Sequence, residues 1–537
     1  MRLSTDEDRD DERALATIAA AVEAGITVFD TARAYGDNEQ LLARALAAMP
    51  RARIVTKGGM SRAGGAWIPD GRAKAIRGDC EASLAALDGL PIDLYLVHAP
   101  DPRTPWRTSV RALARLVEEG FVRRVGVANV NRRQLDEALE LAPIAAVQVA
   151  LSVFDDRAVR GGVVERCAER GVAVIAHSPL GGPRRVRALA RRTELVAAAE
   201  AQHVTPAEVA LARLLRLSPV VVAIPGARRP DTARSAARAA SLVLDAPRAV
   251  RRERRRPSED GEVVVVMGIP GAGKSRLAAQ YVARGYVRLN RDERAGSLRE
   301  LAGALEELLG SGAGRIVLDN TYLTRAARSY VVEAAERHRI RARCLWLDIP
   351  LAQAQVNLVE RLLERFGSLP SPEELRRAAR QEPGLLLPTS QMRTLRELEP
   401  PSTDEGFAAV EQVPFERAAP PDRPHAGVFV AAAALQRPSR LELGDPSAPH
   451  LVFDWRQDEL ADEVARLSSA VSGTVEGAIC PHGGGPPSCW CRPPLPGLPL
   501  AFARKHGIDP ARSVLVGVSP AHRTLAATLG ARFVQSA

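Results

Sequence analysis

The sequence predicts an α/β protein of several domains, each built on a parallel sheet. Between residues 26 and 226, apolar strand-like runs alternate with helical stretches. At 262–275 an apolar run leads into a glycine-rich loop and the start of a helix, and further strand-like runs follow from residue 427. Strand–helix alternation of this kind is typical of parallel sheets covered by helices. We therefore divide the chain into domains at 1–245, 262–417 and 427–537, with linkers at 246–261 and 418–426.

The composition is that of a globular protein. The 537 residues are 46% hydrophobic and 26% charged, which is enough chain for several cores. No apolar run reaches the length of about 18 residues that a membrane helix needs, so we expect no membrane segment. The acidic start, "MRLSTDEDRDDERAL", lacks the apolar core of a signal peptide, which predicts a cytoplasmic protein. The net charge of +10 is compatible with a polyanionic partner but does not demonstrate one.

The first domain is predicted to be a (β/α)8 barrel that lacks its first strand. Seven runs have the character of buried strands: "ITVFDT", "RIVTKG", "IDLYLVH", "RVGVANV", "AAVQVA", "VAVIAHS" and "VVVAIPG". A closed barrel of this type has eight strands. We expect the missing strand to precede residue 1, because the assigned start lies too far downstream or because the barrel opens with an incomplete strand. The Arg-dense segment that follows, 246–261, is expected to be a solvated tether, with nucleic-acid contact as the alternative.

Four polar residues of the barrel stand at or just beyond the ends of strands, where barrel enzymes carry their chemistry. They are Asp30, Tyr35, Lys57 and His98. A cation beside a tyrosine favours the tyrosinate and lowers the tyrosine pKa, which suits a proton donor. The alternative is four unrelated polar residues at strand ends.

The segment "GITVFDTARAYGDNE" resembles the aldo-keto reductase signature, and the four residues match that family's tetrad in order and spacing. "GVANV", "VQVA", "AHSPLG" and "IPGARRPD" resemble its cofactor segments, and the resemblance covers roughly 1–245. It implies NADP(H)-dependent carbonyl reduction, with Tyr35 as general acid, Lys57 and Asp30 tuning its pKa, and His98 orienting the carbonyl. It also implies that Asn129 and Gln148 hold the carboxamide of the cofactor and that Arg228 and Arg229 bind its 2′-phosphate. The other cofactor-binding residues that it implies are His177, Ser178, Leu180 and Gly226.

The barrel departs from the family pattern at two places. Ala128 stands where a serine is common, and His177 stands where an aromatic residue usually stacks on the nicotinamide. A barrel that binds NADP(H) as a sensor and regulates its neighbour is therefore the alternative to a working reductase.

One of the few lysines in the chain lies in a glycine-rich segment of the second domain. The chain has only four lysines, Lys57, Lys74, Lys274 and Lys505, among 74 Lys and Arg residues. Lys274 is the seventh residue of "GIPGAGKS" at 268–275, which follows the apolar run "VVVVM". Glycines at 268, 271 and 273 let backbone N–H groups approach phosphates, and the following helix N-terminus favours anions. The pattern predicts an ATP site: Gly268, Gly271, Gly273 and Lys274 on the phosphates, and Ser275 on Mg²⁺.

The segments after this loop indicate the phosphate acceptor. "LNRDE" and "VLDNT" resemble the 5′-kinase module of polynucleotide kinase-phosphatases, as does "GFAAVEQVPFER". The resemblance implies that Asp292 is the general base for a 5′-hydroxyl of RNA or DNA. Asp319 ends a strand beside the loop. Arg361 and Arg365, four residues apart, would be lid arginines on the transferring phosphate, or else part of a solvated helix face. A small-molecule kinase is the alternative.

The third domain carries a predicted metal site. Cys480, His482, Cys489 and Cys491 have the spacing C-x-H-x₆-C-x-C, a nitrogen and sulfur set suited to tetrahedral Zn²⁺. Buried free thiols are the alternative. The stretch resembles the zinc loop of heptose-bisphosphate phosphatases, which belong to the haloacid dehalogenase superfamily and have a Rossmann-like fold.

The catalytic positions that this resemblance requires carry no carboxylate. Ala431 and Ala433 stand in place of the nucleophile and the acid–base aspartates. Pro493 replaces a lysine, and the metal-binding "GD" has become "GVS" at 517–519. We therefore expect an inactive phosphatase that serves as a scaffold or nucleic-acid-docking surface. The whole chain is predicted to be a polynucleotide 5′-kinase fused to a carbonyl reductase, whose substrate could be a small carbonyl compound or a damaged sugar end.

Overall fold

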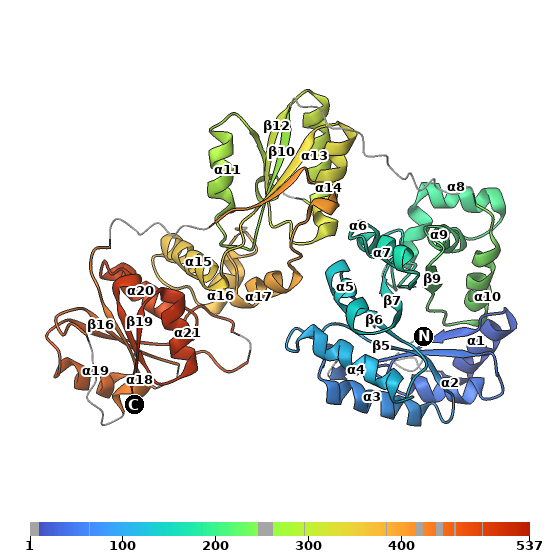
Figure 1. The fold of residues 1–537 in the computed structure, drawn as a ribbon, viewed down its shortest axis with the longest axis horizontal. Helices are drawn as coiled ribbons and strands as arrows, with labels where there is room; N and C mark the ends of the chain where they lie inside the picture. The colour runs from blue at the N-terminus through green and yellow to red at the C-terminus, as the bar shows by residue number, and fades with distance from the viewer. Residues whose placement is uncertain are drawn as a thin grey trace. The chain divides into compact units, whose positions relative to one another are not determined.

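The computed structural model describes residues 10–63, 65–183, 185–244, 261–294, 296–382, 384–414, 423–436, 444–455, 458–485 and 487–536. The chain divides into two compact units, Met1–Glu253 and Arg254–Ala537 (Figure 1). Both sequence-derived linkers fall largely outside the described residues, at 246–260 and 418–422. No helix in the described part combines the length and the apolar character needed to cross a membrane.

The first unit is a parallel barrel of seven strands, as the sequence predicts. The strands pair in the order β1-β2-β5-β6-β7-β8-β9. Their bounds are β1 Val28–Asp30, β2 Arg53–Gly58, β5 Ile92–Val97, β6 Val125–Ala128, β7 Ile144–Ala150, β8 Ala173–His177 and β9 Val221–Ile224. Most of their side chains are buried, because both faces of a parallel sheet are covered. The barrel fold class is therefore confirmed.

The barrel is open between its first and last strands. Within the described residues β1 and β9 are the two edges of the sheet. Val28 on one edge and Val222 on the other are 49% and 48% exposed. A cavity of about 270 Å³ lies here, lined mainly by apolar side chains of β1, β9 and the helices beside them, and also by Asp30. That the missing strand precedes residue 1 stays a prediction.

Helices cover the outside of the barrel. They are α1 Asp11–Glu23, α2 Asn38–Leu46, α3 Ala73–Ala86, α4 Trp106–Glu118, α5 Arg132–Leu141, α6 Arg157–Arg160, α7 Val163–Arg170, α8 Thr193–Gln202, α9 Pro206–Leu215 and α10 Pro230–Arg238. Several begin at polar caps that the sequence makes recognisable, such as Thr205 before α9, whose side chain accepts from the backbone of Glu208. A hairpin of β3 Met60–Ala63 and β4 Ala66–Pro69, which sequence analysis missed, follows β2.

The second unit contains two parallel five-stranded sheets. The first has the order β11-β12-β10-β13-β14. Its strands are β11 Val287–Leu289, β12 Arg315–Asp319, β10 Glu262–Met267, β13 Arg341–Trp346 and β14 Ala409–Gln412. Its helices are α11 Lys274–Val282, α12 Arg291–Arg294, α13 Leu298–Gly310, α14 Arg325–Arg337, α15 Leu351–Phe366, α16 Pro372–Ala378 and α17 Pro388–Glu397. The glycine-rich loop therefore joins the central strand β10 to α11.

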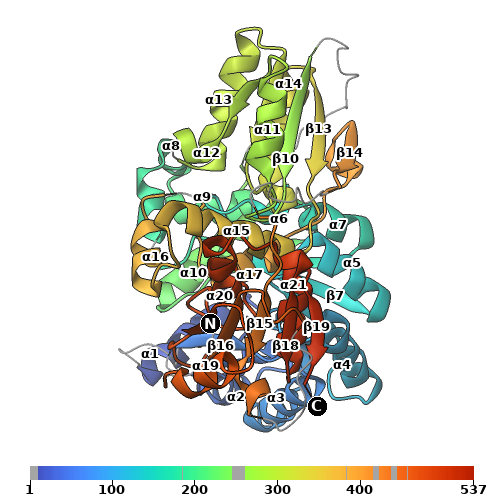
Figure 2. The ribbon, with the colours of Figure 1, turned by 90° about the vertical axis from the view of Figure 1, so that its left-hand side faces the viewer.

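The second sheet of this unit has the order β17-β16-β15-β18-β19, again all parallel. Its strands are β15 Val428–Ala431, β16 His450–Asp454, β17 Val475–Ile479, β18 Val514–Gly517 and β19 Arg532–Gln535. Its helices are α18 Ala432–Leu435, α19 Ala461–Ser468, α20 Gly497–Lys505 and α21 Pro520–Leu529. Figures 1 and 2 both place α15 beside α20 and α21, so a helix that follows β13 of one sheet packs on the helices of the other.

Candidate functional site

The barrel site is organised around a buried ion pair. Lys57, inside β2, is fully buried, and its Nζ lies 2.6 Å from Oδ1 of Asp30, the last residue of β1. The same Nζ donates to the backbone oxygen of Thr31 at 2.6 Å, and Gln148 Nε2 donates to the other carboxylate oxygen of Asp30 at 2.7 Å. Because each partner is hydrogen-bonded, the two charges are tolerated in the core. The pair is held rigidly by two adjacent strands.

Three aromatic rings meet beside this pair. Lys57 Nζ lies 5.6 Å from the centroid of the Tyr35 ring. Tyr35 and His98 pack edge to face with centroids 5.7 Å apart, and Trp67 of the β3–β4 hairpin lies 6.1 Å from Tyr35 and 5.6 Å from His98. All four residues of the sequence-derived tetrad are thus brought together, although 68 residues separate the first from the last. Sequence analysis did not find that Trp67, on the β3–β4 hairpin, is part of this site.

The electrostatics of the site follow from burial. Burial lowers the pKa of Lys57, while the charges of Asp30 and Glu39 act in the opposite direction. Glu39 is fully buried on α2 and accepts from the Thr56 hydroxyl at 2.6 Å, a second acid near the lysine that sequence analysis missed. Burial also lowers the pKa of His177, with the charge of Lys57 adding to the effect. A neutral His177 is the form that this environment favours.

The residues expected to hold a nicotinamide cofactor surround the same end of the barrel. Asn129 donates to the backbone oxygen of His98 at 2.9 Å, and His177 Nε2 lies 2.9 Å from the Asn129 side-chain oxygen. Asn129 and Ser178 have φ of 57° and 52°, so both strand ends turn sharply. Ser178 and Leu180 follow β8, and Gly226, Arg228 and Arg229 follow β9. Gly226 has open space at its Cβ position, and both arginines are exposed.

The glycine-rich loop of the second unit has the backbone that the sequence requires. Gly271 and Gly273 have φ of 88° and 90°, which side-chain-bearing residues rarely adopt. A Cβ on Gly271 would lie 2.4 Å from the backbone oxygen of Ala354, so the loop sits tightly against α15. Gly273 is the N-cap of α11, and its Cβ position meets open space. Ser275, in the first turn of α11, is exposed.

Lys274 folds back over this loop. Its Nζ donates to the backbone oxygens of Gly268 and Ile269 at 3.0 and 3.1 Å. Burial lowers the pKa of Lys274 to about 8, opposed by Asp319 and Asp292 and reinforced by the charge of Arg361. The ammonium group is thus placed where the phosphates of a nucleotide would provide the missing counter-charge.

Asp319 ends β12 and is almost completely buried. Arg288 of β11 binds it through two contacts, Nε to Oδ1 at 3.0 Å and Nη2 to Oδ2 at 2.7 Å. Asn290 Nδ2 donates to the same carboxylate at 2.8 Å, and Arg291 N donates to the side-chain oxygen of Asn320 at 3.0 Å. The "NRD" and "DNT" segments are therefore in direct contact. The part played by Arg288 was not found from the sequence.

The remaining predicted residues of this site lie around it at the surface. Asp292, in the short helix α12, is 44% exposed at its side chain, and its backbone N–H is bound by Asn290 at 2.7 Å. Arg361 on α15 is near enough to influence the pKa of Lys274 and donates to the backbone oxygen of Gly384 at 3.3 Å. Arg365, one turn further, is engaged in an exposed ion pair with Glu382 at 2.6 Å.

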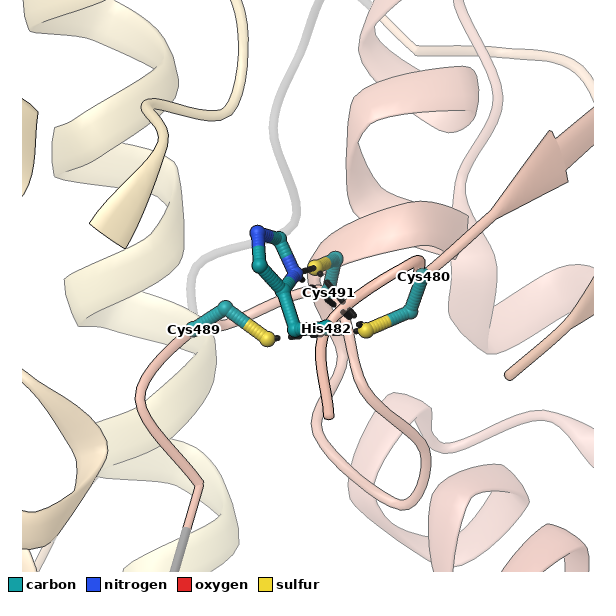
Figure 3. Close-up of side chains that lie close together, drawn as sticks. All are labelled: Cys480, His482, Cys489 and Cys491. Carbon is teal, nitrogen blue, oxygen red and sulfur yellow. Dashed lines mark hydrogen bonds between the residues drawn. The ribbon is translucent and has the colours of Figure 1, made fainter. Parts of the chain in front are cut away.

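The four predicted zinc ligands form one cluster in the third domain (Figure 3). Their ligand atoms all lie within 4.8 Å of one another. Sγ of Cys480 lies 3.5 Å from Sγ of Cys489 and 3.3 Å from Sγ of Cys491, while Nδ1 of His482 lies 3.2 Å from Cys491. In a tetrahedral zinc site with bonds of about 2.3 Å, two sulfurs are about 3.8 Å apart. The donor set therefore fits a zinc ion with no open position.

The positions that the phosphatase resemblance would assign to catalysis lie at the carboxyl edge of the second five-stranded sheet. Ala431 is the last residue of β15 and Ala433 lies in α18, while Gly517 ends the adjacent strand β18 and Ser519 caps α21. An acidic residue at this edge that sequence analysis did not single out is Asp454, which ends β16 and accepts from the backbone of Trp455 at 2.7 Å. Side chains at this edge are therefore close in space, but the two strand-end positions of β15 and β18 carry no acid.

Comparison with known proteins identifies the first two domains. Residues 1–250 match the model of the aldo/keto reductase family, and residues 263–382 match an AAA domain model. An uncharacterized oxidoreductase from Schizosaccharomyces pombe is 31% identical over 261 residues, which cover 48% of this chain and 83% of that protein. An aldo-keto reductase from Strobilurus tenacellus is 30% identical over 310 residues, covering 51% of this chain and 87% of that one.

Among solved structures, the glycerol dehydrogenase from Gluconobacter oxydans is 28% identical, with a TM-score of 0.42 over 45% of this chain and 85% of that chain. The family model covers residues 1–250, which include Asp30, Tyr35, Lys57 and His98. Through residues 1–250, the chain belongs to the aldo/keto reductase family.

Proposed function

We propose that this protein combines an NADP(H)-dependent carbonyl reductase with an ATP-dependent polynucleotide 5′-hydroxyl kinase, and that its third domain is a zinc-bearing phosphatase without catalytic power. The observation that supports the reductase is the buried Lys57–Asp30 pair beneath Tyr35. The observation that supports the kinase is Lys274 folded over a glycine-rich loop next to the Asp319 network.

In the reductase, each residue of the tetrad has a distinct task. NADPH, when bound, supplies the hydride that a carbonyl carbon accepts. Tyr35 donates a proton to the carbonyl oxygen, and the positive charge of Lys57 stabilises the tyrosinate that results. Asp30 keeps that lysine charged despite its burial, and His98 fixes the direction from which the carbonyl oxygen approaches. Arg228 and Arg229, both exposed beyond β9, would bind the 2′-phosphate through planar guanidinium groups.

A test of the reductase is NADPH oxidation with a panel of aldehydes, including oligonucleotides that end in an aldehyde or carry an abasic site. Turnover is expected in the wild type and should be lost in Tyr35→Phe, which removes the donated proton but keeps the ring. Tight NADPH binding by both proteins, with no turnover on any carbonyl, would instead favour the sensing barrel.

In the kinase, phosphoryl transfer depends on placing charges around the nucleotide. Lys274 and the backbone N–H groups at the start of α11 would hold the phosphates, and Ser275 would hold Mg²⁺. Asp292 would accept the proton of the attacking hydroxyl. The direct contact between the "NRD" and "DNT" segments supports the proposed acceptor site, because these segments carry Asp292 and Asp319, whose charges both act on Lys274.

The acceptor can be tested by comparing two oligonucleotides. A 5′-hydroxyl strand and its 5′-phosphorylated twin have the same length and sequence and differ only at the 5′ end, where only the former has a hydroxyl that can accept phosphate. Consumption of ATP should rise with the 5′-hydroxyl strand alone. Equal consumption with both strands, or stimulation by small hydroxyl compounds instead, would support a small-molecule kinase.

The third domain is proposed to lack phosphatase chemistry. Ala431 and Ala433 supply neither a nucleophile nor a proton donor. Zinc at the Cys/His cluster would act structurally, since all four of its positions are taken by protein ligands. About one zinc per chain is expected in purified protein, and it should be lost in Cys489→Ala.

A further inference from the structure

One face of helix α15 contacts the glycine-rich loop, residues 268–273, that precedes α11. Asn357 Nδ2 donates to the backbone oxygen of Gly271 at 2.7 Å, and Gln353 orients that amide by donating to its oxygen at 3.1 Å. Ala354 and Leu358 lie directly against Gly271. From α17, Gln391 donates to the backbone oxygen of the preceding loop residue, Pro270, at 3.3 Å. The loop is therefore supported from behind by α15.

The opposite face of α15 belongs to the core of the third domain. Its apolar residues form one buried cluster with the loop that carries the metal ligands and with α20 and α21: Val356, Val359, Leu362, Leu363, Cys480, Cys489, Trp490, Cys491, Phe502 and Leu525. Figure 3 shows the helices of the kinase domain next to Cys489. Helix α15 thus packs on the glycine-rich loop with one side and on the third domain with the other, and Leu358 takes part in both contacts.

Two polar contacts fix this arrangement. Glu360 of α15 forms a two-point ion pair with Arg423, at 2.6 and 2.8 Å, on the segment that leads into β15. Trp490, between two of the metal ligands, is buried and donates from Nε1 to the backbone oxygen of Leu386 at 2.8 Å. Trp490 therefore joins the loop that carries the metal ligands to the segment between α16 and α17.

We propose that metal bound at the Cys/His cluster positions α15 behind the phosphate loop, so that the third domain controls nucleotide binding in the second. The physical reason is that the four ligands join residues on both sides of a glycine- and proline-rich loop. Without the metal, the four ligand side chains no longer tie the two ends of the loop together, and only packing and the remaining hydrogen bonds would hold that loop and Trp490 in place. Asn357 is then a positioning residue that acts through Gly271 on the nucleotide. This inference rests on the proposed nucleotide site of the kinase domain.

The test uses the full-length protein, with and without zinc. Zinc is removed with a zinc-selective chelator in the presence of Mg²⁺ and then added back, while the affinity for a fluorescent ADP and hydrogen exchange over 351–366 are measured. The proposal predicts that removal weakens ADP binding by at least about fivefold, the range of ordinary coupling between sites, and speeds exchange in α15. Both effects should reverse when zinc is restored.

Variants separate this effect from general damage. Asn357→Ala should weaken ADP binding without loss of zinc, because it removes only the hydrogen bond from α15 to the backbone oxygen of Gly271. Cys489→Ser should lose zinc and weaken ADP binding, whereas Cys167→Ala, which removes a buried free thiol of the barrel, should change neither.

Each outcome decides one question. Unchanged ADP affinity and unchanged exchange after zinc removal would overturn the proposal, as would purified protein that binds no zinc. A zinc-loaded wild type that binds no ADP at all would overturn the proposed kinase function instead. In that case the exchange of α15 still decides whether the metal positions the helix.

Discussion

Nucleotide binding by the second domain should depend on pH through Lys274. Burial lowers the pKa of this lysine from its ordinary 10.5 to about 8 in the nucleotide-free protein. Bound phosphates favour the charged ammonium and therefore raise the pKa again. Because the folded, free form loses its proton near pH 8 while the complex keeps it, affinity must fall as the pH rises through this value.

The size of the effect follows from the pKa of Lys274 in the free protein, since the lysine of the complex stays protonated over the range considered. A lysine of pKa 8 is about 90% protonated at pH 7 and about 10% at pH 9, so ADP affinity should fall roughly tenfold across that interval, equivalent to about 1.4 kcal/mol. Below pH 7 the affinity should change little on account of this residue. Fluorescent ADP binding at constant ionic strength, from pH 7 to pH 9.5, measures the slope.

Lys274→Arg is the matched control, since a guanidinium keeps its proton throughout this range. It should bind ADP more weakly, because the planar group fits the loop less well, but its affinity should not depend on pH. A flat profile in the wild type, or an equal slope in both proteins, would refute the reasoning from burial.

The other predictions concern the remaining sites. Tyr35→Phe should lower kcat/KM for carbonyl reduction by about 100-fold or more while NADPH fluorescence titration shows unchanged binding; near-normal turnover would exclude Tyr35 as the acid. Lys57→Met removes the cation that balances the buried Asp30 carboxylate and should cost about 3–5 kcal/mol of local stability, read from hydrogen exchange of β2 amides; adding Asp30→Asn should recover part of it, and no recovery would contradict the ion-pair argument. Asp292→Ala should bind ATP normally yet transfer phosphate at least about 100-fold more slowly. Pure protein should release no phosphate from a 3′-phosphate end with Mg²⁺, and release would show that the third domain is active.

The fold was largely predictable because its strands are buried on both faces. Such strands are continuous apolar runs in the sequence, and all seven runs of the barrel are strands whose bounds differ from the runs by at most two residues. The hairpin β3–β4 was missed, because its strands are short and exposed and give no apolar run; "AGGAW" at its turn was the available signal.

The candidate sites were predictable only where a local motif marks them. Lys274 and the four predicted zinc ligands stand within short segments of recognisable spacing. Arg288 does not, because its pairing with Asp319 depends on β11 lying beside β12, which sheet order determines and sequence spacing does not. The two-sided packing of α15 was likewise invisible: its apolar positions predict a buried helix but not which domain buries each face.

The most direct test of the proposed kinase is the position of the transferred label. The wild type is incubated with γ-labelled ATP, Mg²⁺ and a 5′-hydroxyl oligonucleotide, and the product is digested to nucleotides. The account predicts label on the 5′-terminal nucleotide alone, and none with Lys274→Ala. Label that appears only as inorganic phosphate, or on small hydroxyl compounds and never on the oligonucleotide, would contradict it.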